Sequence, residues 1–142
     1  HFTLGINGKN SEFHAAMGLA ILPYMQQNID ERKMLSETYD EALKGLPITR
    51  PKLPEGLEYN YAYYPVLFEN EEILLKVVEN LKKNDIVPRR YFWPSLNRLP
   101  YVKASAFQNS EAVSSRILCL PFYNGLGENS IHTIHNILER VI

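Results

Sequence analysis

Cysteine is nearly absent from this chain of 142 residues, which contains only Cys119. A single cysteine excludes any disulfide within the chain. Cys119 lies inside the apolar segment ILCLPF, and free cysteines in such surroundings are usually interior. The sequence therefore predicts a buried and chemically inert thiol.

An excess of charge of one sign is also missing, since 15 basic and 16 acidic residues give a formal net charge of −1. This balance provides no electrostatic footprint for nucleic acid or an anionic membrane surface. No apolar run approaches the roughly 20 residues of a membrane-spanning helix. No signal peptide is visible. We therefore expect no nucleic-acid partner, no membrane association and a cytoplasmic location.

The residues that are present indicate a globular domain, because 45% are hydrophobic and 22% are charged. A chain of this length can bury a substantial core. The spacing of apolar residues predicts helices at 11–22, about 23–45, 70–83, 110–116 and from 128 onward. The positions predicted to point inward from the helix at 70–83 and the last helix are Ile73, Leu74, Val77, Val78, Leu81, Ile131, Ile134, Leu138 and Val141. Aromatic and β-branched runs predict strands at 59–68, 85–93 and 117–122, with strand and loop at 48–58.

This order of elements predicts an α+β fold, an α/β-type small domain in which a short sheet is covered by helices. Asn10 or Ser11 can cap the first helix, and Asn70 can cap the helix at 70–83. Pro23 either breaks the first helix or begins the next. Pro65 within a predicted strand favours a sheet edge or a bulge.

The segment GINGKNSE, residues 5–12, is a polar loop directly before a helix. Glycine and asparagine allow successive backbone N–H groups to converge, and a helix N-terminus adds partial positive charge. Asn7 contributes a side-chain amide and Lys9 a full charge. The loop can therefore hold a phosphate, or it can be a simple connecting turn with a helix cap.

The segment RRYFWPSLNRLPY, residues 89–101, combines arginines with aromatic rings. Arginine suits a diphosphate, and aromatic rings suit sugar faces and bases. Strand alternation predicts Arg89, Tyr91 and Trp93 on one face and Arg90 and Phe92 on the other. The alternative is a strand end with surface arginines and a core tryptophan.

The pattern G-x-N-x-K-x-S-E-x-x-A-A-x-G-L at the start of the chain resembles a signature of the DegT/StrS-type sugar aminotransferases. These are fold type I enzymes that use pyridoxal phosphate and act on nucleotide-linked keto-sugars. The segments at 89–101 and 117–126 resemble two further blocks of that family, in the same order. The residues that match the first pattern are Gly5, Asn7, Lys9, Ser11, Glu12, Ala15, Ala16, Gly18 and Leu19.

The resemblance implies that Asn7 reaches across a homodimer interface to the cofactor phosphate of the other subunit, with Gly8 and Lys9 beside it. It also implies a nucleotide-linked keto-deoxysugar as substrate and glutamate as amino donor. Many relatives have histidine at the position of Asn97, which leaves the sugar subtype open. The substrate-binding residues implied are Arg89, Tyr91, Trp93 and Asn97.

The family's Schiff-base lysine lies in a His-x-x-Lys context that this chain lacks. The residues three positions after its four histidines are leucine, methionine, histidine and leucine. The resemblance thus implies the C-terminal part of an enzyme whose N-terminal large domain is absent, with no catalytic residue and no activity of its own. Residues 1–22 would belong to the large-domain side, and 23–142 would form the C-terminal small domain.

Two alternatives stay open at this point. Some family members have histidine in place of the lysine and dehydrate their substrates. The chain could instead be a non-catalytic binding or regulatory module on the same scaffold.

The helix at 11–22 is expected to expose an apolar face that normally packs on the large domain.

Weaker candidate sites have plainer explanations. His132 and His135 have a spacing that can bind metal, but no cysteine or carboxylate cluster accompanies them, and no metal site is expected. The alternating Tyr59, Tyr61 and Tyr63 indicate strand packing rather than a stacking platform.

Overall fold

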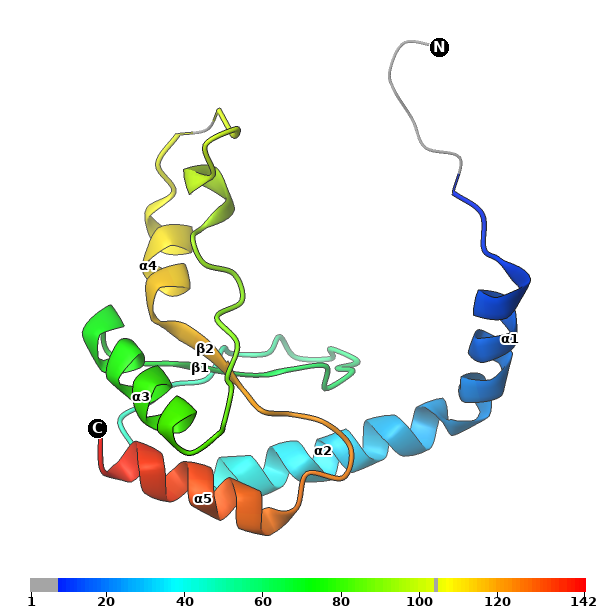
Figure 1. Ribbon diagram of the computed structural model, residues 1–142, viewed down its shortest axis with the longest axis horizontal. Coiled ribbons are helices and arrows are strands. Elements are labelled where there is room, and N and C mark those ends of the chain that lie inside the picture. The colour runs from blue at the N-terminus through cyan, green and yellow to red at the C-terminus, as the bar shows by residue number, and fades with distance from the viewer. Residues whose placement is uncertain (1–7, 104) are drawn as a thin grey trace.

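The structure of the chain is a computed structural model that describes residues 8–103 and 105–142. Asn7 lies outside the described residues. The described residues form seven regular elements and two 3-10 turns, η1 (Leu22–Tyr24) and η2 (Leu96–Arg98) (Figure 1). The elements are α1 (Glu12–Ile21), α2 (Met25–Ala42), β1 (Tyr64–Leu67), α3 (Glu71–Lys83), α4 (Gln108–Arg116), β2 (Ile117–Leu120) and α5 (Glu128–Glu139).

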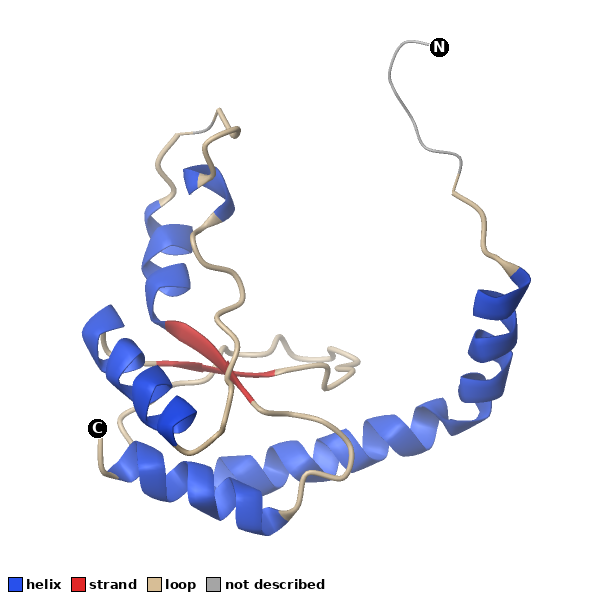
Figure 2. Ribbon diagram, viewed as in Figure 1, coloured by secondary structure: helices blue, strands red, loops and turns tan. Residues whose placement is uncertain are grey.

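The sheet consists of β1 and β2, which pair antiparallel with Tyr64 opposite Leu120. Single bridges extend it on both sides, from Thr49 to β1 and from Arg89 to β2. Figure 2 shows the two short strands at the centre, with helices around them. The predicted α+β class, a short sheet covered by helices, is confirmed.

The strand predicted at 85–93 is wrong, because within it only Arg89 pairs with a strand. Pro88 and Pro94 flank this segment, and proline lacks the N–H that a ladder requires. The strand predicted at 59–68 is shortened to Tyr64–Leu67, since β2 offers only four residues for pairing. The segment at 48–58 contributes only the bridge at Thr49.

Pro65 sits in β1 without breaking the ladder. The N–H of Phe68 donates toward β2, to the oxygen of Arg116, whereas the N–H of Leu67 donates outward to Thr49. Because backbone direction alternates along a strand, the nitrogen of Pro65 faces outward like that of Leu67. The prediction of an edge position is therefore confirmed.

The core lies between the sheet and the helices α2, α3 and α5. Most of the apolar positions predicted to point inward are buried, including Leu74, Leu81, Ile131 and Leu138. Ile73, Val78 and Val141 are partly buried against the same core. The side chain of Asn70 accepts a hydrogen bond from the N–H of Ile73 at 3.0 Å, as predicted for the cap. Burying this apolar surface is the main stabilising contribution to the fold.

The first helix has a different character, because none of its residues is buried. The apolar face expected on this helix includes Phe13, Met17 and Ile21, and it is unpartnered, since these side chains are 73%, 48% and 48% exposed. Ser11 caps α1 by accepting from the N–H of His14, and Pro23 lies in η1 between α1 and α2. Figure 1 shows α1 projecting from the end of the long α2.

Cys119 is only 7% exposed, which confirms the predicted buried thiol. Burial raises the pKa of this thiol and so disfavours the reactive thiolate. In the part of the chain that the structure describes, none of the helices combines the length and apolar character needed to cross a membrane.

Candidate functional site

The segment after α3 carries the predicted substrate-binding residues. The backbone of Arg89 exchanges two hydrogen bonds with Cys119 of β2, at 3.0 and 2.8 Å, which fixes it at the sheet edge. Its guanidinium donates to the phenol oxygen of Tyr91 and stays exposed. The Tyr91 ring contacts that of Tyr63 edge-on, with centroids 5.5 Å apart. Arg89 and Tyr91 thus lie together, as predicted.

Arg90 is directed elsewhere and is held inside the fold. Its guanidinium donates to the Glu71 carboxylate at 2.7 Å and to the carbonyl of Ser115 at 3.1 Å. The same guanidinium lies 4.5 Å over the Trp93 ring. The stacking stabilises this pair through the ring quadrupole.

The predicted separation of Trp93 from Arg90 is therefore wrong. Trp93 shares the side of Arg90, because the chain turns at 91–94 and the alternation of a strand does not apply there. The alternative of a core tryptophan is also wrong, since Trp93 is 54% exposed.

Asn97 lies in a network that joins η2 to α4. Its side-chain NH₂ donates to the Glu111 carboxylate at 2.7 Å and to the carbonyl of Ser105 at 3.3 Å. Its side-chain oxygen accepts from the Ser95 hydroxyl at 2.6 Å. Both ends of this amide are engaged within the chain, which fixes the loop around η2.

Glu111 is the centre of that network. Besides Asn97, its carboxylate accepts from the guanidinium of Arg98 and from the N–H of Phe107. Hydrogen bonds from Arg98, Asn97 and Phe107, in that order of effect, lower the pKa of Glu111. The charged carboxylate therefore ties three points of the segment 97–107 to α4.

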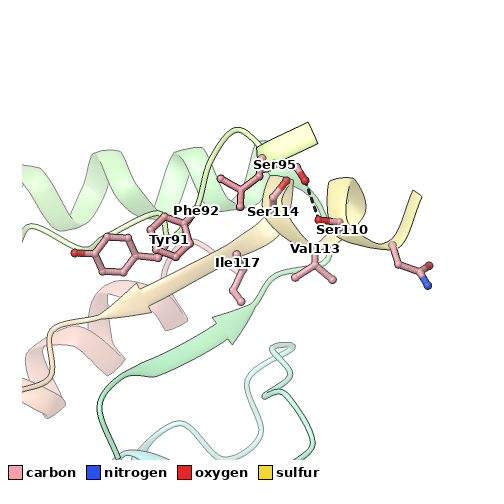
Figure 3. A pocket seen from close by; sticks show the side chains of 9 residues that line it. Tyr91, Phe92, Ser95, Ser110, Val113, Ser114 and Ile117 are labelled. Carbon is pink, nitrogen blue, oxygen red and sulfur yellow. Dashed lines mark hydrogen bonds between the residues drawn. The ribbon is translucent and has the colours of Figure 1, made fainter. Parts of the chain in front are cut away.

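Two pockets lie near this segment, one lined by Arg89 and the other by Tyr91. One, of about 320 Å³, is lined by Arg89 and by Tyr63 and Tyr123 among others. The other, of about 460 Å³, lies between Tyr91 and α4 (Figure 3). The first offers a cation and phenol groups, which suits an anionic ligand that carries hydroxyls.

Tyr63 and Tyr123 line the pocket of about 320 Å³, although neither is among the site residues predicted from the sequence. Tyr63 belongs to the alternating tyrosines attributed to strand packing, yet it precedes β1 and is 52% exposed. Tyr63 precedes Pro65, a residue that disfavours regular strand pairing. This position in the sequence could have indicated that Tyr63 lines a pocket. Tyr59 and Tyr61 instead contact each other edge-on, with centroids 4.9 Å apart.

The predicted cofactor residues lie apart from this region. Gly8 and Lys9 are exposed and precede α1, and α1 and α4 lie on opposite sides of the view in Figure 1. The structure therefore does not bring the two predicted sets of residues together within one chain. Among the described residues, no three histidine, cysteine, aspartate or glutamate side chains gather as a metal site.

The chain is similar in sequence to curated proteins that are named as sugar transaminases. The chain is 34% identical to a dTDP-4-amino-4,6-dideoxy-D-glucose transaminase of Escherichia coli, over 94% of this chain and 38% of that protein. It is 26% identical to a GDP-perosamine synthase of Vibrio cholerae, over 98% of this chain and 39% of that protein. The chain thus spans less than half the length of these relatives.

The crystal structure of DesI in the presence of its TDP-sugar product superimposes with a TM-score of 0.85 and 29% identity. The match covers 96% of this chain and 36% of that one. The model of the DegT/DnrJ/EryC1/StrS aminotransferase family matches residues 1–139. With that match over nearly its full length, the chain belongs to the DegT/DnrJ/EryC1/StrS aminotransferase family.

Proposed function

We propose that this chain is the C-terminal part of a pyridoxal-phosphate-dependent aminotransferase that acts on a nucleotide-linked keto-deoxysugar. The observation that carries the proposal is the family match over residues 1–139. The relatives named as sugar transaminases add the substrate class. Glutamate is the proposed amino donor, and the cytoplasm is the proposed location, which suits a buried free thiol.

The proposed organisation assigns residues 1–22 to the large-domain side and 23–142 to the small domain. The unburied α1 supports this division, because an exposed apolar helix face needs a partner surface. In the proposed assembly, a homodimer, the loop before α1 enters the active site of the other subunit.

The residues before α1 fit a phosphate group. The Ser11 hydroxyl is used by the helix cap, whereas the Lys9 ammonium is exposed at the positive end of the α1 dipole. We propose that Asn7, Gly8 and Lys9 bind the phosphate of the partner's pyridoxal phosphate. When bound, that cofactor supplies the electron sink for moving an amino group onto the sugar carbonyl carbon.

The substrate side of the proposal rests on the segment after α3. In the proposed site the exposed guanidinium of Arg89 binds the diphosphate, and its hydrogen bond to Tyr91 supports this role by orienting it. Trp93 offers an exposed ring to the sugar. Asn97 completes the set, and because both ends of its amide are engaged, it acts by fixing the loop.

The test uses the complete protein that contains this chain, loaded with pyridoxal phosphate. It is mixed with glutamate and dTDP-linked keto-6-deoxyhexoses, and the amino sugar is measured by mass spectrometry. We expect amination and a visible absorbance band of bound cofactor. A protein that binds no cofactor, or that dehydrates these sugars without transferring nitrogen, would contradict the proposal.

Arg89→Lys provides the matched variant in the same assay. Lysine keeps the charge but loses the planar fork that binds a diphosphate through two parallel hydrogen bonds. We expect KM for the nucleotide sugar to rise about tenfold, with the cofactor absorbance unchanged. An unchanged KM would remove Arg89 from the proposed diphosphate site.

A further inference from the structure

The pocket of about 460 Å³ next to Tyr91 is not explained by the contacts described so far. Tyr91 and Phe92 form one wall, and Val113 of α4 and Ile117 of β2 belong to its apolar lining (Figure 3), as does Leu96. Its volume lies within the range of small-molecule pockets, about 300–1,000 Å³. No charged side chain occurs among its lining residues.

The lining suits a flat, uncharged ring. The rings of Tyr91 and Phe92 have centroids 5.0 Å apart and form an aromatic wall, and such walls favour stacked or edge-on aromatic partners. A sugar would be a poor occupant, since each of its hydroxyls needs a hydrogen-bond partner. The hydroxyls of Ser95 and Ser110 already bond to each other at 2.8 Å.

One polar group of the lining remains available. Asn109, in the first turn of α4, is exposed, and its carboxamide forms no hydrogen bond among the described residues. A carboxamide presents a donor and an acceptor side by side. The edge of a nucleobase presents the complementary pair, a ring N–H beside a carbonyl oxygen.

Tyr91 joins this neutral pocket to the charged one. It lines the pocket beside α4, while its phenol oxygen accepts from Arg89, which lines the pocket of about 320 Å³. A nucleotide has the same division, a flat neutral base on one side and charged phosphates on the other.

We propose that the pocket formed by Tyr91, Phe92 and Val113 binds the base of the nucleotide-sugar substrate, with Asn109 pairing with the base edge. This inference rests on the proposed function, because it takes the substrate to be a nucleotide-linked sugar. It assigns discrimination between nucleotides to α4 and Phe92, and recognition of the diphosphate to Arg89.

The test measures binding of thymidine 5′-monophosphate to the complete, cofactor-loaded protein by calorimetry. Val113→Trp fills the pocket, and we expect the affinity for this probe to fall by about tenfold or more, as for the loss of a stacked base. KM for the dTDP-linked sugar rises by a similar factor while kcat stays within about twofold. Asn109→Ala adds no bulk, and it should lower the affinity for thymidine 5′-monophosphate by about three- to tenfold.

Two controls separate the base from the rest of the ligand. Leu75→Trp places the same bulk on the outer face of α3, where Leu75 is 49% exposed, and it should leave probe binding unchanged. Ribose 5-phosphate lacks the base, so Val113→Trp should not alter its binding.

The proposal is overturned if Val113→Trp and Asn109→Ala bind thymidine 5′-monophosphate like the unaltered protein. It is also overturned if Val113→Trp changes the sedimentation of the protein and not the affinity for the probe, since the pocket would then be a protein-docking surface. Failure of the proposed function has a different signature. In that case the protein would neither aminate the sugar nor bind the cofactor, even if it bound the probe and Val113→Trp abolished that binding.

Discussion

The guanidinium of Arg90 lies 4.5 Å over the ring of Trp93, so two residues three apart in the sequence share one side of the loop. The same guanidinium bonds to Glu71 and to the carbonyl of Ser115. Arg89, its neighbour, instead extends toward solvent and Tyr91. Two adjacent arginines thus have separate roles, one in stability and one in the candidate site.

Replacing Arg90 should therefore affect stability. In Arg90→Ala the carbonyl of Ser115 and the Glu71 carboxylate lose their shared donor, and the Trp93 ring loses its cation. We expect the free energy of unfolding to fall by about 1–3 kcal/mol, the cost of leaving such partners unsatisfied. Urea unfolding followed by circular dichroism measures this change.

Arg89→Ala is the control, because the guanidinium it removes is exposed and bonds only to Tyr91 among the described residues. It should change the free energy of unfolding by less than about 0.5 kcal/mol. If Arg89→Ala destabilises the protein more than Arg90→Ala, the division of roles between the two arginines is wrong.

Glu111 gives the structure a predicted dependence on pH. Its hydrogen bonds to Arg98, Asn97 and Phe107 hold its folded-state pKa below the ordinary value. Its contribution to stability is therefore present at neutral pH and is lost as the pH falls through that lowered pKa. Glu111→Gln should lower the urea midpoint at about pH 7 and lower it less at about pH 3.

The measurement is a series of urea midpoints across this pH range for both proteins. Glu79→Gln is a suitable comparison, since Glu79 also has a lowered pKa but pairs only with Lys83 on the surface of α3. A midpoint difference for Glu111→Gln that is constant with pH would argue against the network.

Asn124 connects the turn after β2 to α2. Its side-chain NH₂ donates to Glu31 at 2.7 Å and to Asn28, and its oxygen accepts from Arg32 at 2.9 Å. Asn124→Ala should lower the free energy of unfolding by about 1–3 kcal/mol because these partners lose their hydrogen bonds. Thermal unfolding monitored by circular dichroism measures the change.

Asn124→Asp tests the charge of the same contact. The new carboxylate would face Glu31, whose pKa is lowered chiefly by the hydrogen bond from Asn124. We expect Asn124→Asp to be the less stable variant at neutral pH and to recover relative to Asn124→Ala in acid. Equal stability of the two variants at neutral pH would mean that the attraction of Arg32 for the new carboxylate offsets the repulsion from Glu31.

The exposed face of α1 should make the 142-residue chain self-associate. Replacing Phe13 and Met17 together by serine removes two large exposed side chains of this face. We expect the apparent mass in light scattering to fall toward that of a monomer, because the apolar patch drives association. Lys33→Ser on α2 should leave the mass unchanged, and a wild-type chain that is already monomeric would contradict this prediction.

Features that depend on neighbouring residues followed from the sequence, whereas features that depend on distant segments did not. Asn70 as a cap, Leu74 and Leu81 as inward positions, and Cys119 as a buried thiol all followed from the sequence and are confirmed. Each depends on residues within a few positions, through helical spacing or a run of apolar neighbours. The grouping of Arg89 with Tyr91 also followed, although from a strand that does not form there.

The rest of the candidate site depended on segments far apart in the sequence. Asn97 is directed by Glu111, and the ring of Tyr91 is placed against Tyr63. The pocket beside α4 forms because the loop after Arg89 lies against α4 and Ile117, and the other forms because Arg89 lies beside the end of β2 and Tyr63. No local pattern in the segment at 89–101 encodes those partners.

The sequence by itself determined the helices, their caps, their buried faces and the family, because these depend on side-chain type and short-range spacing. The tertiary structure alone decided that Arg90 faces inward while Arg89 faces outward. It also decided that Tyr91, which lines a neutral pocket, bonds to Arg89, which lines another. The reason is physical. The direction of a side chain in a loop is set by the partners that compensate its desolvation, and those partners arrive only when distant segments pack together.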